Sequence, residues 1–107
     1  VGPGAAVLPG ATVNAASTVG AGAILNTNCT VDHDSVIGEF AHVAPGVAMA
    51  GGVHVGTGAF VGIGARVIPG IRIGDRATVG AGATVIRDVN PDTVVIGVPA
   101  HELRKPS

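Results

Sequence analysis

The chain has 107 residues, a formal net charge of −1 and no Trp or Tyr. This length allows one domain, and a compact globule of this size would bury only a modest core. No apolar run approaches the roughly 20 residues of a membrane span, and no stretch has the charged and apolar regions of a signal peptide. Cys29 is the only cysteine. An intramolecular disulfide is therefore excluded, and a reducing compartment, the cytoplasm, is expected.

An apolar residue recurs at every sixth position from Val1 to Val85, which makes fifteen hexapeptides without an insertion. The position four residues later is always small or aliphatic, and Gly often follows the apolar residue, as at Gly20 and Gly38. A period of six predicts short strands separated by corners and wound into a coil, with both apolar columns pointing inward. The recurrent Gly is expected to supply the positive φ and the close backbone approach that a sharp corner needs.

The end of the chain departs from this repeat. Asn90-Pro91-Asp92 is a turn signal, and residues 93–100 are predicted to form one more extended segment that caps the last coil, followed by a short polar tail from 101 to 107. Charge is uneven, because residues 1–31 carry no charged side chain and every Lys and Arg lies at or after Arg66. A solvated surface whose charges have no function would explain this pattern. Contact of the C-terminal coils with a polyanion would explain it as well.

Residues 26–34 are the least repeat-like segment. They place His33 between Asp32 and Asp34, at a position outside the two inward columns, so the ring should face solvent. A neighbouring carboxylate orients an imidazole and raises its basicity for general-base work. The alternative is a surface histidine beside surface acids.

Residues 1–89 resemble the left-handed parallel β-helix of the hexapeptide-repeat acyltransferases, in which three hexapeptides make one triangular coil. The resemblance implies an all-β, single-stranded left-handed β-helix of about five coils, with residues 90–107 as an extended C-terminal cap and tail. One stretch is similar to the sugar O- and N-acetyltransferases of the sialic acid and bacillosamine pathways, whose pattern is N-T-x-x-x-[VI]-[DE]-H-[DE]-x-x-I-G-x-[FY]-x-H. The matching residues are Asn26, Thr27, Val31, Asp32, His33, Asp34, Ile37, Gly38, Phe40 and His42.

This resemblance implies an acetyl-CoA-dependent transferase, without a metal, that moves acetyl to an amine or hydroxyl of a sugar or nucleotide sugar. It implies that His33 is the general base, that Asp34 enhances its basicity and that Asn26 shapes the acceptor site. The implied acetyl-CoA contacts are His42, Gly51, Ile63 and Ala81. The family's usual N-terminal nucleotide-sugar-binding domain has no counterpart in this sequence, and His101 stands where the family usually has Lys. The acceptor and the choice between N- and O-acetylation stay open.

With 18 residues in a coil, His33 and His42 lie half a coil apart, on widely separated sides of one chain. Paired roles for them require an oligomer, and a homotrimer with active sites between subunits is expected. Gly51 is one coil beyond His33, so its N–H should lie about one strand spacing, roughly 4.8 Å, from the base. That arrangement suits stabilisation of an oxyanion, and a loose corner at Gly51-Gly52 is the alternative.

Three other interpretations fit parts of the sequence. A non-catalytic trimeric scaffold, or a truncated inactive domain, would show the same repeat. A γ-type carbonic anhydrase would use His33, His42 and His54 as zinc ligands, although their 9- and 12-residue spacings do not match that family's pattern. Cys29 as a covalent nucleophile is less favoured than a packing role, because it occupies the small inward column.

Overall fold

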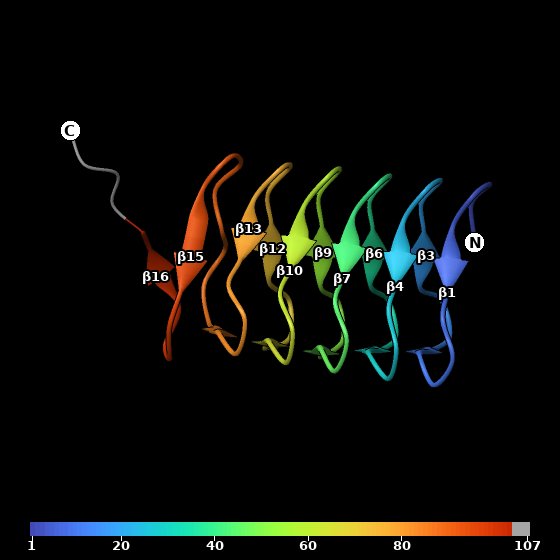
Figure 1. Ribbon diagram of the computed structural model, residues 1–107, viewed down its shortest axis with the longest axis horizontal. Helices are drawn as coiled ribbons and strands as arrows, with labels where there is room; N and C mark the ends of the chain where they lie inside the picture. The colour runs from blue at the N-terminus through green and yellow to red at the C-terminus, as the bar shows by residue number, and fades with distance from the viewer. Residues whose placement is uncertain (104–107) are drawn as a thin grey trace.

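A computed structural model describes residues 1–103, which form strands and turns without a helix. The strands make three faces of a triangular coil (Figure 1). Face A contains β1 (Ala6–Val7), β4 (Ile24–Leu25), β7 (His42–Val43), β10 (Phe60–Val61), β13 (Thr78–Val79), β15 (Val94–Ile96) and β16 (His101–Glu102). Face B contains β2 (Thr12–Val13), β5 (Thr30–Val31), β8 (Ala48–Met49), β11 (Arg66–Val67) and β14 (Thr84–Val85). Face C contains β3 (Thr18–Val19), β6 (Val36–Ile37), β9 (His54–Val55) and β12 (Arg72–Ile73).

Each strand from β4 to β14 pairs in parallel with the strand one coil before it. On face A, for example, Ile24 pairs with His42 and His42 pairs with Phe60, so stacked residues are 18 apart. In Figure 1 the face A strands run downward at the front, the chain returns behind them, and the coils advance from right to left, so the winding is left-handed. The predicted fold, a left-handed parallel β-helix of about five coils, is confirmed.

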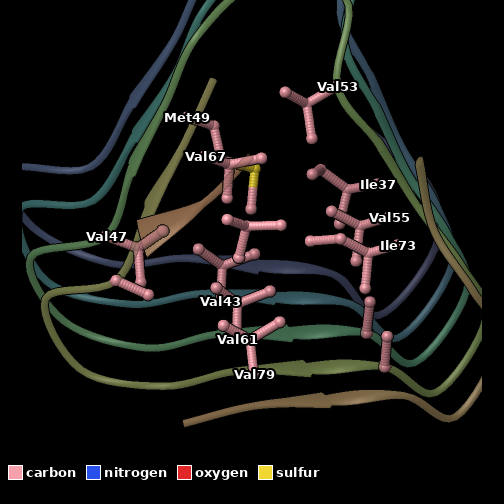
Figure 2. Packing of buried hydrophobic residues seen from close by; sticks show 14 of the residues in the cluster. Ile37, Val43, Val47, Met49, Val53, Val55, Val61, Val67, Ile73 and Val79 are labelled. Carbon is pink, nitrogen blue, oxygen red and sulfur yellow. The ribbon is translucent and has the colours of Figure 1, made fainter. Parts of the chain in front are cut away.

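Two inward columns fill the interior. In the strands from β1 to β15 the second residue points into the triangle, where Val43, Val61 and Val79 of face A meet residues of the other two faces (Figure 2). The second column is small, with Ala at most corners, which allows the three faces to approach closely. The first coil has no coil on its outer side, so Val1 stays 83% exposed.

In the hexapeptides up to residue 84, the fourth residue forms a corner with positive φ. Fourteen successive corners, from Gly4 to Gly82, place a residue with φ between 57° and 78° at the fourth position of the hexapeptide. Pro precedes it in four of them, as in Pro45-Gly46, and Pro followed by a positive-φ residue is typical of a type II turn.

The Gly that often follows the apolar residue has one of its two predicted roles. Gly20 and Gly38 do not have positive φ, so that part of the prediction was wrong. Close approach does require them, because a Cβ on Gly38 would lie 2.8 Å from the carbonyl carbon of Gly56 and from the amide nitrogen of Thr57. The successive coils therefore touch through their backbones at these positions.

The last coil is two residues shorter than the others. Ile73 pairs with Val89, and Thr78 pairs with Val94, so the spacing there is 16. The extended segment predicted for 93–100 is wrong beyond Ile96, because the chain turns over 97–100 and returns as β16, antiparallel to β15. The predicted polar tail therefore begins as a strand, and its last residues, 104–107, lie outside the described range.

Candidate active site

His33 projects from the corner between faces B and C, in the turn formed by residues 32–35. Its side chain is 66% exposed, as the repeat position predicted. The ring Nδ1 lies 3.4 Å from Oδ2 of Asp34, and Nε2 lies 3.9 Å from Oδ1 of Asp32. Asp34 occupies the positive-φ position of this corner, with φ 60°, which Asp tolerates better than most residues. Asp34 thus faces Nδ1, and Nε2 has no hydrogen-bond partner within the described residues.

A serine hydroxyl from the preceding coil bonds to both ends of the His33 turn. At the corners between faces A and B and between faces C and A, the fourth residue of the turn donates its N–H to the first carbonyl, as Cys29 does to Asn26 at 3.2 Å. In the turn 32–35, Ser17 Oγ stands between these groups, donating to the Asp32 carbonyl at 2.9 Å and accepting from the Ser35 N–H at 3.2 Å. The fully buried Ser35 repeats this bridge in the next coil, between the Ala50 carbonyl and the Val53 N–H. In the two turns that carry His33 and Gly51, a serine hydroxyl from the preceding coil therefore bonds to both the first carbonyl and the fourth N–H.

Gly51 lies directly against the imidazole. A Cβ at this position would be 3.1 Å from Cε1 of His33 and 3.4 Å from its Nδ1. The Gly52 N–H donates to the His33 carbonyl at 3.0 Å, which fixes the two turns to each other. Within residues 1–103 the Gly51 N–H donates to no backbone carbonyl. An unused amide donor is thus held beside the candidate base.

Asn26, at the corner between faces A and B, and His42, on face A, form a second cluster. The Nδ2 atom of Asn26 lies 3.4 Å from Nε2 of His42, and Oδ1 of Asn26 accepts the Thr27 N–H at 2.7 Å, which orients the amide toward the histidine. The other side of the His42 ring packs edge-on against Phe60, with ring centroids 5.1 Å apart. Phe60 was not predicted from the sequence, although it stands 18 residues after His42 and therefore stacks on it.

Ile63 and Ala81 stack at the corner between faces A and B, where Gly82 donates its N–H to the Ile63 carbonyl at 2.8 Å. This is the corner that also carries Asn26. One chain therefore brings Asn26, Ile63 and Ala81 to one corner and the His33 group to the next, with a full face between them.

Face B, between these two corners, carries an open groove of about 620 Å³. Its lining is mostly small and apolar, and Arg66 supplies its positive charge. The lining residues are Gly46, Ala48, Met49, Ala50, Gly64, Arg66, Val67, Ile68, Pro69 and Thr84. Arg76 is engaged elsewhere, because its Nε and Nη2 donate to Asp92 at 2.7 and 3.1 Å. This pairing raises the pKa of Arg76 and lowers the pKa of Asp92.

The geometry does not support a zinc site of the carbonic anhydrase type or Cys29 as a nucleophile. His33, His42 and His54 lie on the B–C corner, face A and face C, and no group of three potential metal ligands occurs within residues 1–103. Cys29 is fully buried, and burial raises the pKa of its thiol, which disfavours the nucleophilic thiolate. Within the same described range, no helix is long and apolar enough to cross a membrane.

Residues 52–87 match the family described as bacterial transferase hexapeptide (six repeats). The chain is a hexapeptide-repeat β-helix. No curated protein matches this hexapeptide-repeat chain, whereas solved structures do.

The acetyltransferase domain of PglB from Neisseria gonorrhoeae FA1090 is 36% identical over 96% of this chain and 50% of its own, with a TM-score of 0.95. PerB from Caulobacter crescentus, solved with CoA and GDP-perosamine, is 44% identical over 95% of this chain and 55% of its own, with a TM-score of 0.85. WeeI from Acinetobacter baumannii AYE is 31% identical over 96% and 48%, with a TM-score of 0.80. The hexapeptide-repeat chain thus spans about half the length of these relatives.

Proposed function

We propose that this chain is the catalytic part of an acetyl-CoA-dependent acetyltransferase that acts on an amine or hydroxyl of a sugar or nucleotide sugar. The observation that carries the proposal is the exposed His33 ring, held with Nδ1 3.4 Å from Asp34 and packed against Gly51. The likeness to an acetyltransferase domain and to an enzyme solved with CoA and GDP-perosamine supports the reaction class and the acceptor class.

In the proposed reaction, Nε2 of His33 takes a proton from the acceptor amine or hydroxyl. The freed electron pair attacks the thioester carbonyl of acetyl-CoA, and the tetrahedral intermediate collapses with departure of the CoA thiolate. The proton held by His33 then passes to that thiolate, so the base is regenerated. The Gly51 N–H is the proposed donor to the oxyanion, and Asp34 stabilises the protonated ring through Nδ1.

The acetyl-CoA site is proposed to lie on a second chain. Asn26 and His42 are held together at 3.4 Å, but they lie away from the His33 corner of their own chain. A threefold homotrimer would bring this cluster of one subunit to the His33 corner of the next, with Asn26 at the acceptor and His42 at the acetyl-CoA. Ile63 and Ala81, stacked on the same corner as Asn26, would line the path of the pantetheine arm.

Arg66 is the proposed partner of the CoA phosphates, because it lines the groove on face B whereas Arg76 is bound by Asp92. Arg66→Ala should raise the KM for acetyl-CoA and leave that for acetyl-pantetheine, which lacks the nucleotide, unchanged. Equal effects on both donors would contradict this assignment.

Since the single cysteine is buried and free, we place the enzyme in the cytoplasm.

The function is tested by calorimetry and by thiol release. Acetyl-CoA is titrated into the wild-type chain and into His33→Asn, a near-isosteric change that removes the base, and CoA release is followed with GDP-perosamine and a panel of other amino-sugar nucleotides. We expect both proteins to bind acetyl-CoA and only the wild type to turn over, with a loss of roughly 10²- to 10⁴-fold in the variant. Absence of acetyl-CoA binding would favour a non-catalytic scaffold, and unchanged turnover in His33→Asn would remove the base assignment.

A further inference from the structure

The carboxylate of Asp32 is held close to the Nε2 atom of His33 without bonding to it. Its Oδ1 accepts two hydrogen bonds, from Nδ2 of Asn14 at 3.0 Å and from the His33 backbone N–H at 2.8 Å. The distance from this oxygen to Nε2 is 3.9 Å, which is too long for a hydrogen bond. The side chain therefore points to the backbone of the turn and leaves Nε2 free.

Asn14 belongs to the preceding coil and stands 18 residues before Asp32. The same corner supplies Ser17, whose hydroxyl donates to the Asp32 carbonyl at 2.9 Å. The preceding coil thus holds Asp32 through its side chain and its backbone. The hydrogen bond from Asn14 is also the largest cause of the lowered pKa of Asp32, so this carboxylate is anionic at neutral pH.

An anion this close to the base competes with the substrate when it is free to rotate. The charged side chains beside the His33 ring are Asp32 and Asp34, because the stacked turns 14–17 and 50–53 contain no charged residue. Asp34 faces Nδ1, on the other side of the ring from the acceptor. A released Asp32 would instead pair with the protonated Nε2 and occupy the place where the acceptor proton must arrive.

We propose that Asn14 is a positioning residue for the base: by holding the Asp32 carboxylate against the backbone of the turn, it keeps that carboxylate off the Nε2 atom of His33. The proposal rests on the proposed function in taking His33 as the base. The side chain of Asn14 donates to Asp32 and makes no hydrogen bond to His33 within the described residues, so its proposed action passes through Asp32.

The test compares Asn14→Ala with Thr18→Ala, a matched exposed control on the same coil. Asn14→Ala should lower kcat at neutral pH by roughly 3- to 10-fold with an unchanged KM for acetyl-CoA, and should move the acid limb of the kcat profile to higher pH. Its melting temperature should stay near that of the wild type because the side chain is exposed. The same substitution made in an Asp32→Asn background should have no further effect, because the carboxylate is already gone.

NMR titration of the His33 ring protons supplies a readout that does not depend on turnover. We expect the titration midpoint to move to higher pH in Asn14→Ala and to return in the double variant with Asp32→Asn. If the wild type shows no acetyl transfer, the proposed function fails while this titration still tests the contact. A profile and titration identical to the wild type, or an Asn14→Ala effect that persists in the Asp32→Asn background, would overturn the proposal.

Discussion

Replacing Gly38 by Ala should destabilise the coil more than replacing Gly64. A Cβ on Gly38 would lie 2.8 Å from the Gly56 carbonyl carbon and 2.9 Å from the Val55 carbonyl oxygen, both backbone atoms of the next coil. Ordinary contact begins at 3.4 Å, so the two coils must separate by 3.4 − 2.8, or 0.6 Å. This separation stretches the 2.7 Å hydrogen bond from the Gly38 N–H to the Val55 carbonyl.

The expected cost is about 1–3 kcal/mol for the overpacking and about 1 kcal/mol for the weakened hydrogen bond. For a domain of this size each kcal/mol lowers the melting temperature by about 4–8 °C, so Gly38→Ala should melt at least about 8 °C below the wild type. At Gly64 a Cβ would have room, because nothing lies within 4 Å of it. The φ angle there is +69°, which an L side chain rarely adopts. Gly64→Ala should therefore cost only about 1–2 kcal/mol of conformational strain.

Thermal unfolding followed by circular dichroism at one fixed protein concentration compares the two variants, because any oligomer makes the midpoint depend on concentration. The interpretation requires Gly38→Ala to melt below Gly64→Ala. If Gly38→Ala melts at or above Gly64→Ala, the coils are not packed backbone to backbone at this position.

Three further predictions concern the site and its surroundings. Gly51→Ala should displace the His33 ring by a few tenths of an ångström, since the new Cβ lies 3.1 Å from Cε1, and lower kcat by about 10- to 100-fold with little change in melting temperature; unchanged kinetics would show that the ring does not work from this position. Cys29 should resist a thiol reagent at pH 8 until the chain unfolds, and Cys29→Ala should keep its turnover, whereas loss of turnover without unfolding would revive a covalent route. Arg76→Ala should lower the melting temperature at pH 7, and this difference should disappear in acid. The sign follows from Asp92, whose folded pKa lies below the ordinary 3.8, so the pair stabilises above that pH and the stabilisation is lost as the pH falls through the lowered value; a difference that persists at pH 2 would contradict an ionic origin.

The sequence predicts most of this fold because each hexapeptide of the repeat corresponds to one strand and one corner. Every sixth residue is apolar since each strand contributes one inward side chain, and the 18-residue coil then follows from three faces. The same arithmetic correctly stacks Gly51 on His33 and aligns Ile63 with Ala81. It also contains Phe60 and Asn14, which were overlooked because neither belongs to the His33 motif.

Other features of the structure could not be predicted from the six-residue period. The φ angle of a glycine is not visible in the sequence, so one role was expected where the structure shows two: no room for a Cβ at Gly38, in the second position of its hexapeptide, and a left-handed backbone at Gly64, in the fourth. The last coil shortens to 16 residues, so the register that predicts every earlier coil fails after Val85. The bridges from Ser17 and Ser35 depend on hydroxyl positions in a column that otherwise reads as small and apolar.

In the proposed trimer each active site is shared between two chains. Subunit mixing tests it directly, using His33→Ala and His42→Ala, each of which should be inactive alone. In randomly mixed trimers a site is intact when one subunit supplies His33 and the next supplies His42, with a probability of one half for each, so about one quarter of wild-type activity should return. Mixed trimers, verified by mass spectrometry, that stay as inactive as the two parents would contradict the account and place the whole site within one chain.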